Sequence, residues 1–452
     1  MKFSAICVYF ISISSIEAFL FNPLPRIESK AIGDDYGKPL FLTPYLERGD
    51  IHGAQIASSV KPLLKNIKSY SGFLTVDKIY NSNLFFWFFP AEIDNTKAPV
   101  LLWLQGGPGT ASTYGLFNEH GPFYFNNKSQ LIPREYYWSK KLNVLYIDNP
   151  VGTGFSFTEN EKGYATNQTY IAENLYKALI QFFQLFPQYS DNDFYATGES
   201  YAGKYVPTLA YKIHTENRVK KKINLKGISV GNGACDPITM MGYDEYLYNL
   251  GLIDIKGKSA MKQIQNDVIS LVKQNRFNET FPLMNRLKDL YFKLTGFKEF
   301  YNYITDQEPS PFGDLEILFN NKTIRKILHV GNLTHHNGDL VMSYLQDDMM
   351  KSVKPYIEVL LEHYKVLIYN GQLDIVLAYP LTINFIHSLN WTGVEQYRNA
   401  ERKLWYVDNE LAGYTKTAGK FTEVLVRNAG HMVPSDQPKW AYDLITKFTN
   451  TS

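Results

Sequence analysis

The chain has 452 residues, 45% of them hydrophobic, and its 46 basic and 44 acidic residues leave a formal net charge of +2. This balance argues against a nucleic-acid-binding surface and an acidic tail, and the length allows a large core with an inserted subdomain. We interpret the one basic cluster, residues 218–222, as a solvated helix end and loop, with a processing site as the alternative.

The first twenty residues predict a signal peptide, because Lys2 precedes a short apolar stretch and cleavage after Ala18 or a few residues later fits the pattern. Cleavage would remove Cys7 and leave Cys235 as the single cysteine, so we expect no internal disulfide bond. The chain is thus expected to enter the secretory pathway and to be secreted or lysosomal/endosomal. Seven glycosylation sequons support this route: Asn127, Asn167, Asn278, Asn321, Asn332, Asn390 and Asn450. No other segment is long and apolar enough to predict a membrane span.

Six short apolar runs, each ending in a glycine-bearing turn, predict strands buried on both faces of a mainly parallel sheet. They lie at 98–107, 142–152, 193–198, 225–233, 365–371 and 421–430. Helical patterns between them, at 168–186 and 200–216, are typical of an α/β protein. From 236 to 350 helical periodicity replaces the strand pattern. We therefore expect a helical cap at 236–350 inserted into a core of residues 21–235 and 351–452.

The stretch "DFYATGESYAGKYVP" (193–207) predicts a strand, a tight turn at Gly198 and a helix that begins near Ser200. Such a turn lifts a serine hydroxyl above the sheet and points a helix N-terminus at developing negative charge. A second glycine is usual two residues after the serine, where this chain has Ala202 followed by Gly203. Gly-x-Ser alone fits a structural turn equally well, but its position between strand and helix favours a nucleophile.

A nucleophile of this kind is followed along the chain by an acid and then a histidine. Asp374 follows the strand at 365–371 by a short loop, and His431 follows the strand at 421–430 directly. A histidine held by a carboxylate can take the serine proton and return it to a leaving group. The alternatives are Asp254 at a helix end, Asp408 in a polar turn, His387 in a helical segment, and His335 and His336 in a loop that we expect to be exposed.

Acyl transfer also needs two backbone N–H groups to stabilise an oxyanion. Tyr201, directly after the serine, is one candidate donor. Gly107, in the turn "WLQGGPG" (103–109), is the other.

With these residues in place, the chain resembles the serine carboxypeptidases of the α/β-hydrolase superfamily. The matching stretches are "LLWLQGGPG", "NEHGPF", "IDNPVGTGFS", "FYATGESYAGKYVP", "GISVGNG", "YNGQLDIV" and "NAGHMVPSDQP", which span roughly residues 40 to 445. "WLQGGPG" and "YNGQLDIV" are most similar to the vitellogenic and vitellogenic-like branch. The resemblance implies an α/β-hydrolase fold and removal of the C-terminal residue of peptides and proteins through an acyl-enzyme, best at acidic pH.

The resemblance also implies a role for each matching residue. It puts Ser200, Asp374 and His431 in a catalytic triad and Gly107 and Tyr201 in the oxyanion hole. It implies that the substrate carboxylate is bound by Trp103, Gln105, Gly106, Glu119 and Glu199, and that Met432 lines the pocket of the departing residue, S1′. It implies no cofactor and no metal, peptide or protein C-termini as partners, no nucleic acid, and it leaves a homodimer open.

Three departures from the family pattern stand out. Gln105 replaces the asparagine of many relatives, and Thr110 replaces a cysteine in "GGPGTAS". The cap is the least matched region, so no preference for a terminal side chain can be carried over.

Two acids beside a site for a carboxylate would repel the substrate if both were ionised. Close together and desolvated, Glu119 and Glu199 are expected to have raised pKa values, so that a protonated carboxyl can donate a hydrogen bond to the substrate. These acids favour a peptidase over the alternatives, which are an esterase or acyltransferase on the same fold, or a carboxypeptidase-like protein with an added partner-stabilising role.

Overall fold

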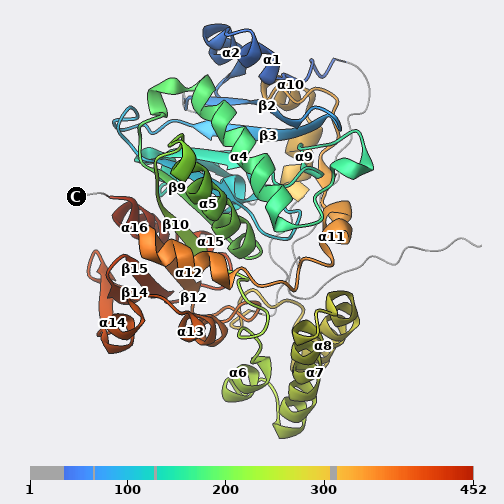
Figure 1. The fold of residues 1–452 in the computed structure, drawn as a ribbon, viewed down its shortest axis with the longest axis vertical. Helices are drawn as coiled ribbons and strands as arrows, with labels where there is room; N and C mark the ends of the chain where they lie inside the picture. Colours follow the sequence, from blue (N-terminus) through green and yellow to red (C-terminus); the bar gives the residue numbers. More distant parts are fainter. Residues whose placement is uncertain (1–34, 65–66, 127–129, 306–312, 451–452) are drawn as a thin grey trace, which may run out of the picture.

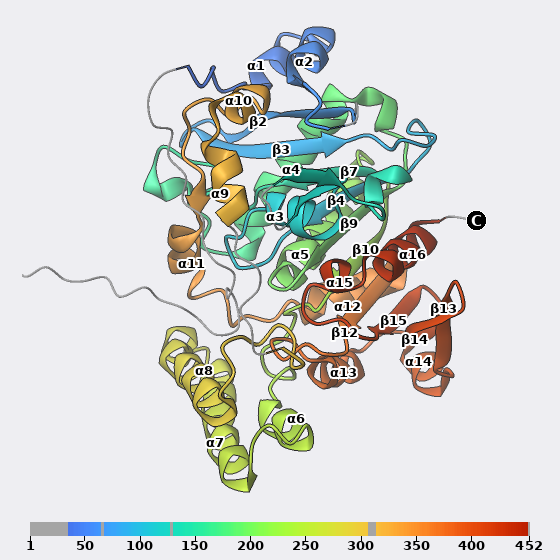
Figure 2. The same cartoon turned by 180° about the vertical axis from the view of Figure 1, so that it is seen from behind.

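The structure is a computed structural model that describes residues 35–64, 67–126, 130–305 and 313–450. The signal-peptide prediction at 1–20, Cys7 and the sequon at Asn127 lie outside these residues. The described chain is built around an 11-stranded sheet with the order β1-β2-β3-β7-β4-β9-β10-β12-β15-β14-β13. Helices cover both faces: α4, α5 and α12 lie on one face (Figure 1), and α3, α15 and α16 lie on the other (Figure 2).

The six strands in the middle of the sheet are parallel. They are β4 (Val100–Leu104), β7 (Asn143–Ile147), β9 (Phe194–Glu199), β10 (Leu225–Gly231), β12 (Lys365–Gly371) and β15 (Phe421–Val426). Five of them fall within a predicted run, and β9 extends one residue beyond the run at 193–198, so the parallel core of the sheet is confirmed. All five residues of β4 and all five of β7 are buried, because helices pack against both faces of these strands.

The margins of the sheet are antiparallel and were not predicted. One margin consists of β1 (Ser59–Val60), β2 (Ser69–Asp77) and β3 (Ser82–Phe89), and the other of β14 (Glu410–Ala418) and β13 (Lys403–Val407). All eight residues of β3 are buried, so its aromatic side chains add to the core.

Two of the helices around the sheet precede its first strand, and the others lie between or after its strands. These helices are α1 (Thr43–Glu47), α2 (Ile51–Ser58), α3 (Thr113–Gly115), α4 (Gln168–Leu185), α5 (Ala202–Val219), α12 (Lys354–His363), α13 (Tyr379–Ser388), α14 (Val394–Asn399), α15 (Val433–Asp436) and α16 (Pro438–Thr449). Helix α4 turns an apolar stripe towards the sheet and a polar one outward, as its buried positions show. The first half of α5, residues 202–210, is buried on all sides. Among the described helices, none combines the length and apolarity that crossing a bilayer requires.

Residues 236–350 are mainly helical, and their described helices form two groups. The first group is α6 (Tyr243–Asn249), α7 (Ile255–Lys273) and α8 (Thr280–Thr295), which project from the sheet. The second is α9 (Gly313–Asn320), α10 (Lys322–Ile327) and α11 (Asp339–Leu345), which lie nearer β2 and β3 (Figures 1 and 2). A short bridge of β11 (His336–Asn337) with β8 (Thr153–Gly154) attaches the second group to the core.

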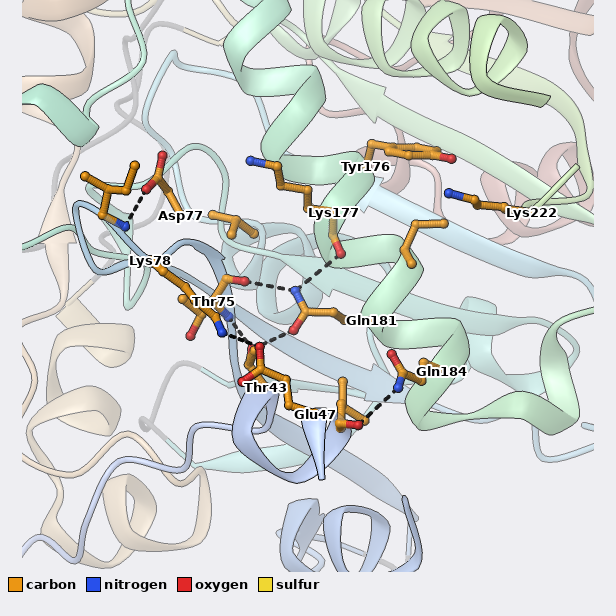
Figure 3. Close-up of a pocket in the computed structure, with 14 residues that line it drawn as sticks. Thr43, Glu47, Thr75, Asp77, Lys78, Tyr176, Lys177, Gln181, Gln184 and Lys222 are labelled. Carbon is orange, nitrogen blue, oxygen red and sulfur yellow. Dashed lines mark hydrogen bonds and ion pairs between the residues drawn. The ribbon is translucent and has the colours of Figure 1, made fainter. Parts of the chain in front are cut away.

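A surface groove of about 640 Å³ lies between α1, β2 and α4 (Figure 3). Its polar side chains bond one another: Thr43 Oγ1 donates to Gln181 Oε1 over 2.5 Å, and Gln181 Nε2 donates to the Thr75 carbonyl over 2.9 Å. None of the predicted site residues lines this groove. We therefore read it as a structural junction between the first helix and the sheet.

Candidate active site

Ser200 occupies the turn between β9 and α5 in a left-handed backbone conformation, with a φ of +60°. This conformation is strained for a residue with a side chain and needs support from its surroundings. Three backbone hydrogen bonds supply it: Ser200 N–H donates to the Gly231 carbonyl over 3.0 Å, and the Ser200 carbonyl accepts from Gly203 N–H over 2.9 Å and Ala234 N–H over 3.0 Å. A tight turn is thus present, but two residues later than predicted, because Gly198 lies within β9 and α5 begins at Ala202. The end of β10 holds the Ser200 turn in place.

Asp374 and His431 form a buried pair, with 2.9 Å between Asp374 Oδ2 and His431 Nδ1. The carboxylate is fixed by Val376 N–H, 2.8 Å from Oδ1, and by Asn232 Nδ2, 2.6 Å from Oδ2. A carboxylate that accepts from Nδ1–H leaves the other ring nitrogen, Nε2, as a proton acceptor. Asn232 was missed in the sequence, although "GNG" at the end of a predicted strand marks its position.

Ser200, Asp374 and His431 follow β9, β12 and β15, and Asn232 follows β10. These four strands are consecutive neighbours in the sheet and run in the same direction. Their carboxyl ends therefore meet at one edge, which is where a ligand site is expected in an α/β sheet.

The glycine turn after β4 packs against the Ser200 turn. A Cβ on Gly106 would lie 2.6 Å from the Tyr201 backbone nitrogen and 2.7 Å from Ser200 Cβ, so only glycine permits this approach. Gly107 has a φ of +113°, which also favours glycine. Thr110, at the position where relatives have cysteine, closes the turn by donating its N–H to the Gly106 carbonyl over 3.2 Å.

A buried chain of hydrogen bonds leads from Trp103 to Glu199. Trp103 Nε1 donates to Gln105 Oε1 over 2.9 Å, and Gln105 Nε2 donates to Glu199 Oε1 over 2.7 Å. The indole N–H fixes the orientation of the amide, because only its oxygen can accept. Gln105, whose extra methylene distinguishes it from asparagine, spans the distance between the two partners.

Glu119 and Glu199 are both buried, with 0% and 1% of their surfaces exposed. Burial raises the pKa of Glu119 to about 7, while neighbouring groups, Glu199 and Gln105 first, act in the opposite direction. Burial also raises the pKa of Glu199 well above its usual range, and the charge of Glu119 raises it further. The two carboxyls titrate as a pair, in agreement with the raised pKa values expected from the sequence.

The oxygens of this acid pair are unusually poor in partners. Both carboxyl oxygens of Glu119 and Oε2 of Glu199 lack a well-formed hydrogen bond among the described residues, although Gln105 and Glu199 lie close enough to act on the Glu119 pKa. The Tyr369 hydroxyl also lacks a hydrogen-bond partner among the described residues. Burial raises its pKa well above the usual value, and the charges of Glu199 and Glu119 raise it further. Buried polar atoms without a partner are costly in a folded protein, so they mark a place where a polar ligand group can bind.

Met432 contacts Tyr114, whose pKa burial raises first and the charges of Glu119 and Glu199 raise further. The Tyr114 hydroxyl donates to Met432 Sδ over 3.5 Å, and the ring of Tyr301 lies 5.6 Å from that of His431, centroid to centroid. Tyr114 and Tyr301 were missed in the sequence. Tyr114 lies between the "WLQGGPG" and "NEHGPF" stretches without belonging to either, and the chain around Tyr301 resembles no catalytic motif.

Residues Phe300–Tyr303, which we call the strap, form backbone hydrogen bonds with the chain segments that carry Asp374 and His431. The Tyr301 carbonyl accepts from His431 N–H over 2.7 Å, the Phe300 carbonyl accepts from Ile375 N–H over 3.2 Å, and Tyr303 N–H donates to the Leu373 carbonyl over 3.0 Å. The strap thus bonds to both neighbours of Asp374 and to His431 itself.

The alternative candidates have other surroundings. Asp254 caps the N-terminus of α7, Asp408 pairs with Lys439 over 3.2 Å, and His387 is exposed on α13. The expectation that His335 is exposed was wrong: only 4% of it is exposed, and its ring stacks on Phe319 at 4.6 Å. His336 is half-buried in β11. The phenyl ring beside His335 comes from α9, a contact that the local sequence does not reveal.

A family model for serine carboxypeptidases matches residues 60–451 of this chain. The chain belongs to the serine carboxypeptidase family. The venom serine carboxypeptidase of Apis mellifera is 52% identical to it over 440 residues, which cover 95% of this chain and 94% of that one. The vitellogenic carboxypeptidase of Aedes aegypti is 44% identical over 450 residues, which cover 96% of this chain and 95% of that one. The protein is accordingly a peptide hydrolase of the serine carboxypeptidase type.

The solved structures show the same fold. A prohormone-processing carboxypeptidase from Saccharomyces cerevisiae superposes with a TM-score of 0.77 at 23% identity, over 88% of this chain and 96% of that one. The mainly parallel sheet flanked by helices is the α/β-hydrolase fold, as the sequence predicted.

Proposed function

We propose that Ser200 is the nucleophile, that His431 is its general base and that Asp374 orients the imidazole. The observation that carries this assignment is the left-handed turn at Ser200, which lies at the same sheet edge as the Asp374–His431 pair. The N–H groups of Gly107 and Tyr201 are proposed as the oxyanion donors, because the glycine turn packs directly against the Ser200 turn.

In this mechanism Ser200 Oγ attacks the last peptide carbonyl of the substrate while His431 Nε2 takes the hydroxyl proton. The imidazolium then protonates the leaving amine, the C–N bond breaks and the C-terminal residue departs, leaving an ester between Ser200 and the rest of the peptide. Water attacks this ester with His431 again as the base, and Ser200 regains its proton.

We further propose that Trp103, Gln105, Gly106, Glu119 and Glu199 bind the substrate's terminal carboxylate. The unpaired oxygens of the acid pair support this role, because a protonated carboxyl can donate a hydrogen bond to a carboxylate. The second N–H of the Gln105 amide adds a donor. With the pKa of Glu119 at about 7, the pair stays protonated in mild acid, so peptide release is proposed to be fastest at acidic pH.

Met432, beside His431 and in contact with Tyr114, is proposed to line the pocket of the departing residue. Residues 236–350 are proposed to form a cap over a core of 21–235 and 351–452. We also propose entry into the secretory pathway, with glycosylation among the sequons. Five of them, Asn278, Asn321, Asn332, Asn390 and Asn450, are exposed.

A library of blocked dipeptides, assayed between about pH 4 and about pH 8, tests the function, since mild acid should protonate the acid pair. We expect release of the C-terminal residue, loss of activity with a serine-directed organophosphate, and no release by Ser200→Ala. Absence of release at every pH would overturn the proposal. Faster cleavage of esters than of any peptide would favour the esterase alternative, and a partner stabilised equally by Ser200→Ala would show an added non-catalytic role.

A further inference from the structure

Glu119 lies in a turn whose backbone cannot complete its own hydrogen bonds. The π-helix η1 (Leu116–His120) carries Glu119, and it ends where Gly121 N–H donates to the Leu116 carbonyl over 3.0 Å. The same spacing one residue later would require Pro122 to donate to the Phe117 carbonyl. Proline has no N–H, so this carbonyl needs a donor from elsewhere.

Arg134 supplies that donor. Its Nη2 donates to the Phe117 carbonyl over 2.7 Å, and its Nε donates to the Gly121 carbonyl over 3.0 Å. Arg134 directly follows β6 (Leu131–Pro133), which pairs with β5 (Phe123–Phe125), and its own N–H donates to the Pro122 carbonyl over 3.0 Å. One guanidinium therefore bridges the backbone on both sides of Glu119, which the fixed fork of arginine permits and a lysine ammonium does not.

The charge of Arg134 acts on Glu119 as well. Both of its described side-chain hydrogen bonds go to uncharged carbonyl oxygens, and the charge of Glu119 raises the Arg134 pKa against the lowering effect of burial. Reciprocally, the charges of His431 and Arg134 lower the Glu119 pKa against the raising effect of burial. His120, the next residue, adds no charge near neutrality, because burial holds its pKa well below its usual value.

The other titratable groups near Glu119 are the carboxyl of Glu199 and three tyrosines on other elements. Burial raises the pKa values of these tyrosines well above the ordinary range, so they stay neutral: Tyr114, Tyr146 and Tyr369. Among the described residues, Arg134 is consequently the permanently charged cation that acts on Glu119, whereas His431 is charged only when protonated.

We propose that Arg134 is a positioning residue for Glu119, and that it sets the pH above which the acid pair no longer binds the substrate carboxylate. This inference rests on the proposed role of the pair. Arg134 has two effects in this proposal. Its guanidinium hydrogen bonds hold Glu119 in place at every pH. Its positive charge makes the pair lose its proton at a lower pH than it would with an uncharged side chain at position 134.

The test compares Arg134→Gln, which removes the charge, with Arg134→Lys, which keeps the charge but loses the fork. Arg402→Gln is the matched control, because Arg402 is exposed directly before β13 and packs on Tyr414 at 3.8 Å from the ring centroid. For each variant, kcat and KM are measured across pH for a blocked dipeptide and for an ester that lacks a free carboxylate.

Both Arg134 variants should raise the peptide KM at acidic pH, by about ten-fold for lost hydrogen bonds to a charged group. The midpoint of the alkaline rise in peptide KM should move to higher pH in Arg134→Gln and stay in place in Arg134→Lys. Ester hydrolysis and the control should match the wild type. An unchanged midpoint in Arg134→Gln, or equal losses on peptide and ester, overturns the proposal.

Should Arg134→Gln fail to fold, Arg134→Lys decides, because a wild-type peptide KM at acidic pH would contradict the positioning role. The role of the acid pair and the role of Arg134 are overturned by different results. A wild-type enzyme in which peptide and ester KM share one pH dependence overturns the role of the acid pair and this proposal together. A wild type with the expected difference, combined with an unmoved midpoint in Arg134→Gln, overturns the role of Arg134 alone.

Discussion

Replacing Glu119 by glutamine should remove much of the pH dependence of peptide binding. The pKa of Glu119 at about 7 marks the first proton loss of the pair. One unit above that midpoint, at about pH 8, only about one-tenth of the wild-type enzyme keeps the fully protonated pair, so its peptide KM should be about ten-fold higher than in mild acid. In Glu119→Gln the remaining acid, Glu199, has a pKa well above its usual range because of burial, and the peptide KM should rise only at higher pH.

The assay measures peptide and ester KM at several pH values for the wild type, for Glu119→Gln, for Glu199→Gln and for the double variant. An exposed acid gives the control, Glu395→Gln, which removes only a surface pair with Arg398. The double variant has no carboxyl in the pair, so its peptide KM should be flat with pH apart from effects shared with the ester. A double variant whose peptide KM rises in step with the wild type would refute the reasoning.

Three further predictions follow from the site and the core. Ser200→Ala should lower kcat for peptides by about 10³-fold or more while leaving binding of a product-like peptide intact, as measured by calorimetry. Asn232→Ala should lower kcat/KM about ten-fold, because Asp374 loses its 2.6 Å hydrogen bond; no loss would show that the other donors suffice. Burial raises the pKa of Asp148 to about 7 in the folded state, against about 3.9 unfolded. This group therefore favours folding at low pH, and the benefit fades as pH rises from about 4 to about 7. Thermal melting should show a fall over that range which Asp148→Asn reduces; an identical fall in both proteins would contradict the assignment.

The central strands could be predicted because a strand buried on both faces consists of a continuous run of apolar residues. An apolar run does not show the direction of its strand. The run "SNLFFWFF" forms β3, and its antiparallel direction follows only from its pairing with β2 and β7. The placement of Ser200, Asp374 and His431 at one edge of the sheet could be predicted because each follows a strand, and the fold brings together the carboxyl ends of those strands. Asn232 was not proposed from the sequence although "GNG" follows a predicted strand, and no local pattern points to the hydrogen bonds that Arg134 donates to the Phe117 and Gly121 carbonyls.

The burial of His335 could not be predicted from the sequence either. Its polar neighbours in the chain suggested exposure, yet packing against Phe319 buries it. The same limit applies to Tyr301, which lies beside His431 because the chain after α8 returns to the sheet. What the sequence lacks in each case is the identity of the tertiary neighbour.

The strap at Phe300–Tyr303 limits how this enzyme can be redesigned. Its hydrogen bonds reach the loops of both Asp374 and His431, so the relative placement of the two side chains depends on a part of the chain outside the parallel strands. Exchanging residues 236–350 for the matching segment of a relative would also exchange this support. A chimaera should therefore keep Phe300–Tyr303 and join the foreign segment on either side of it.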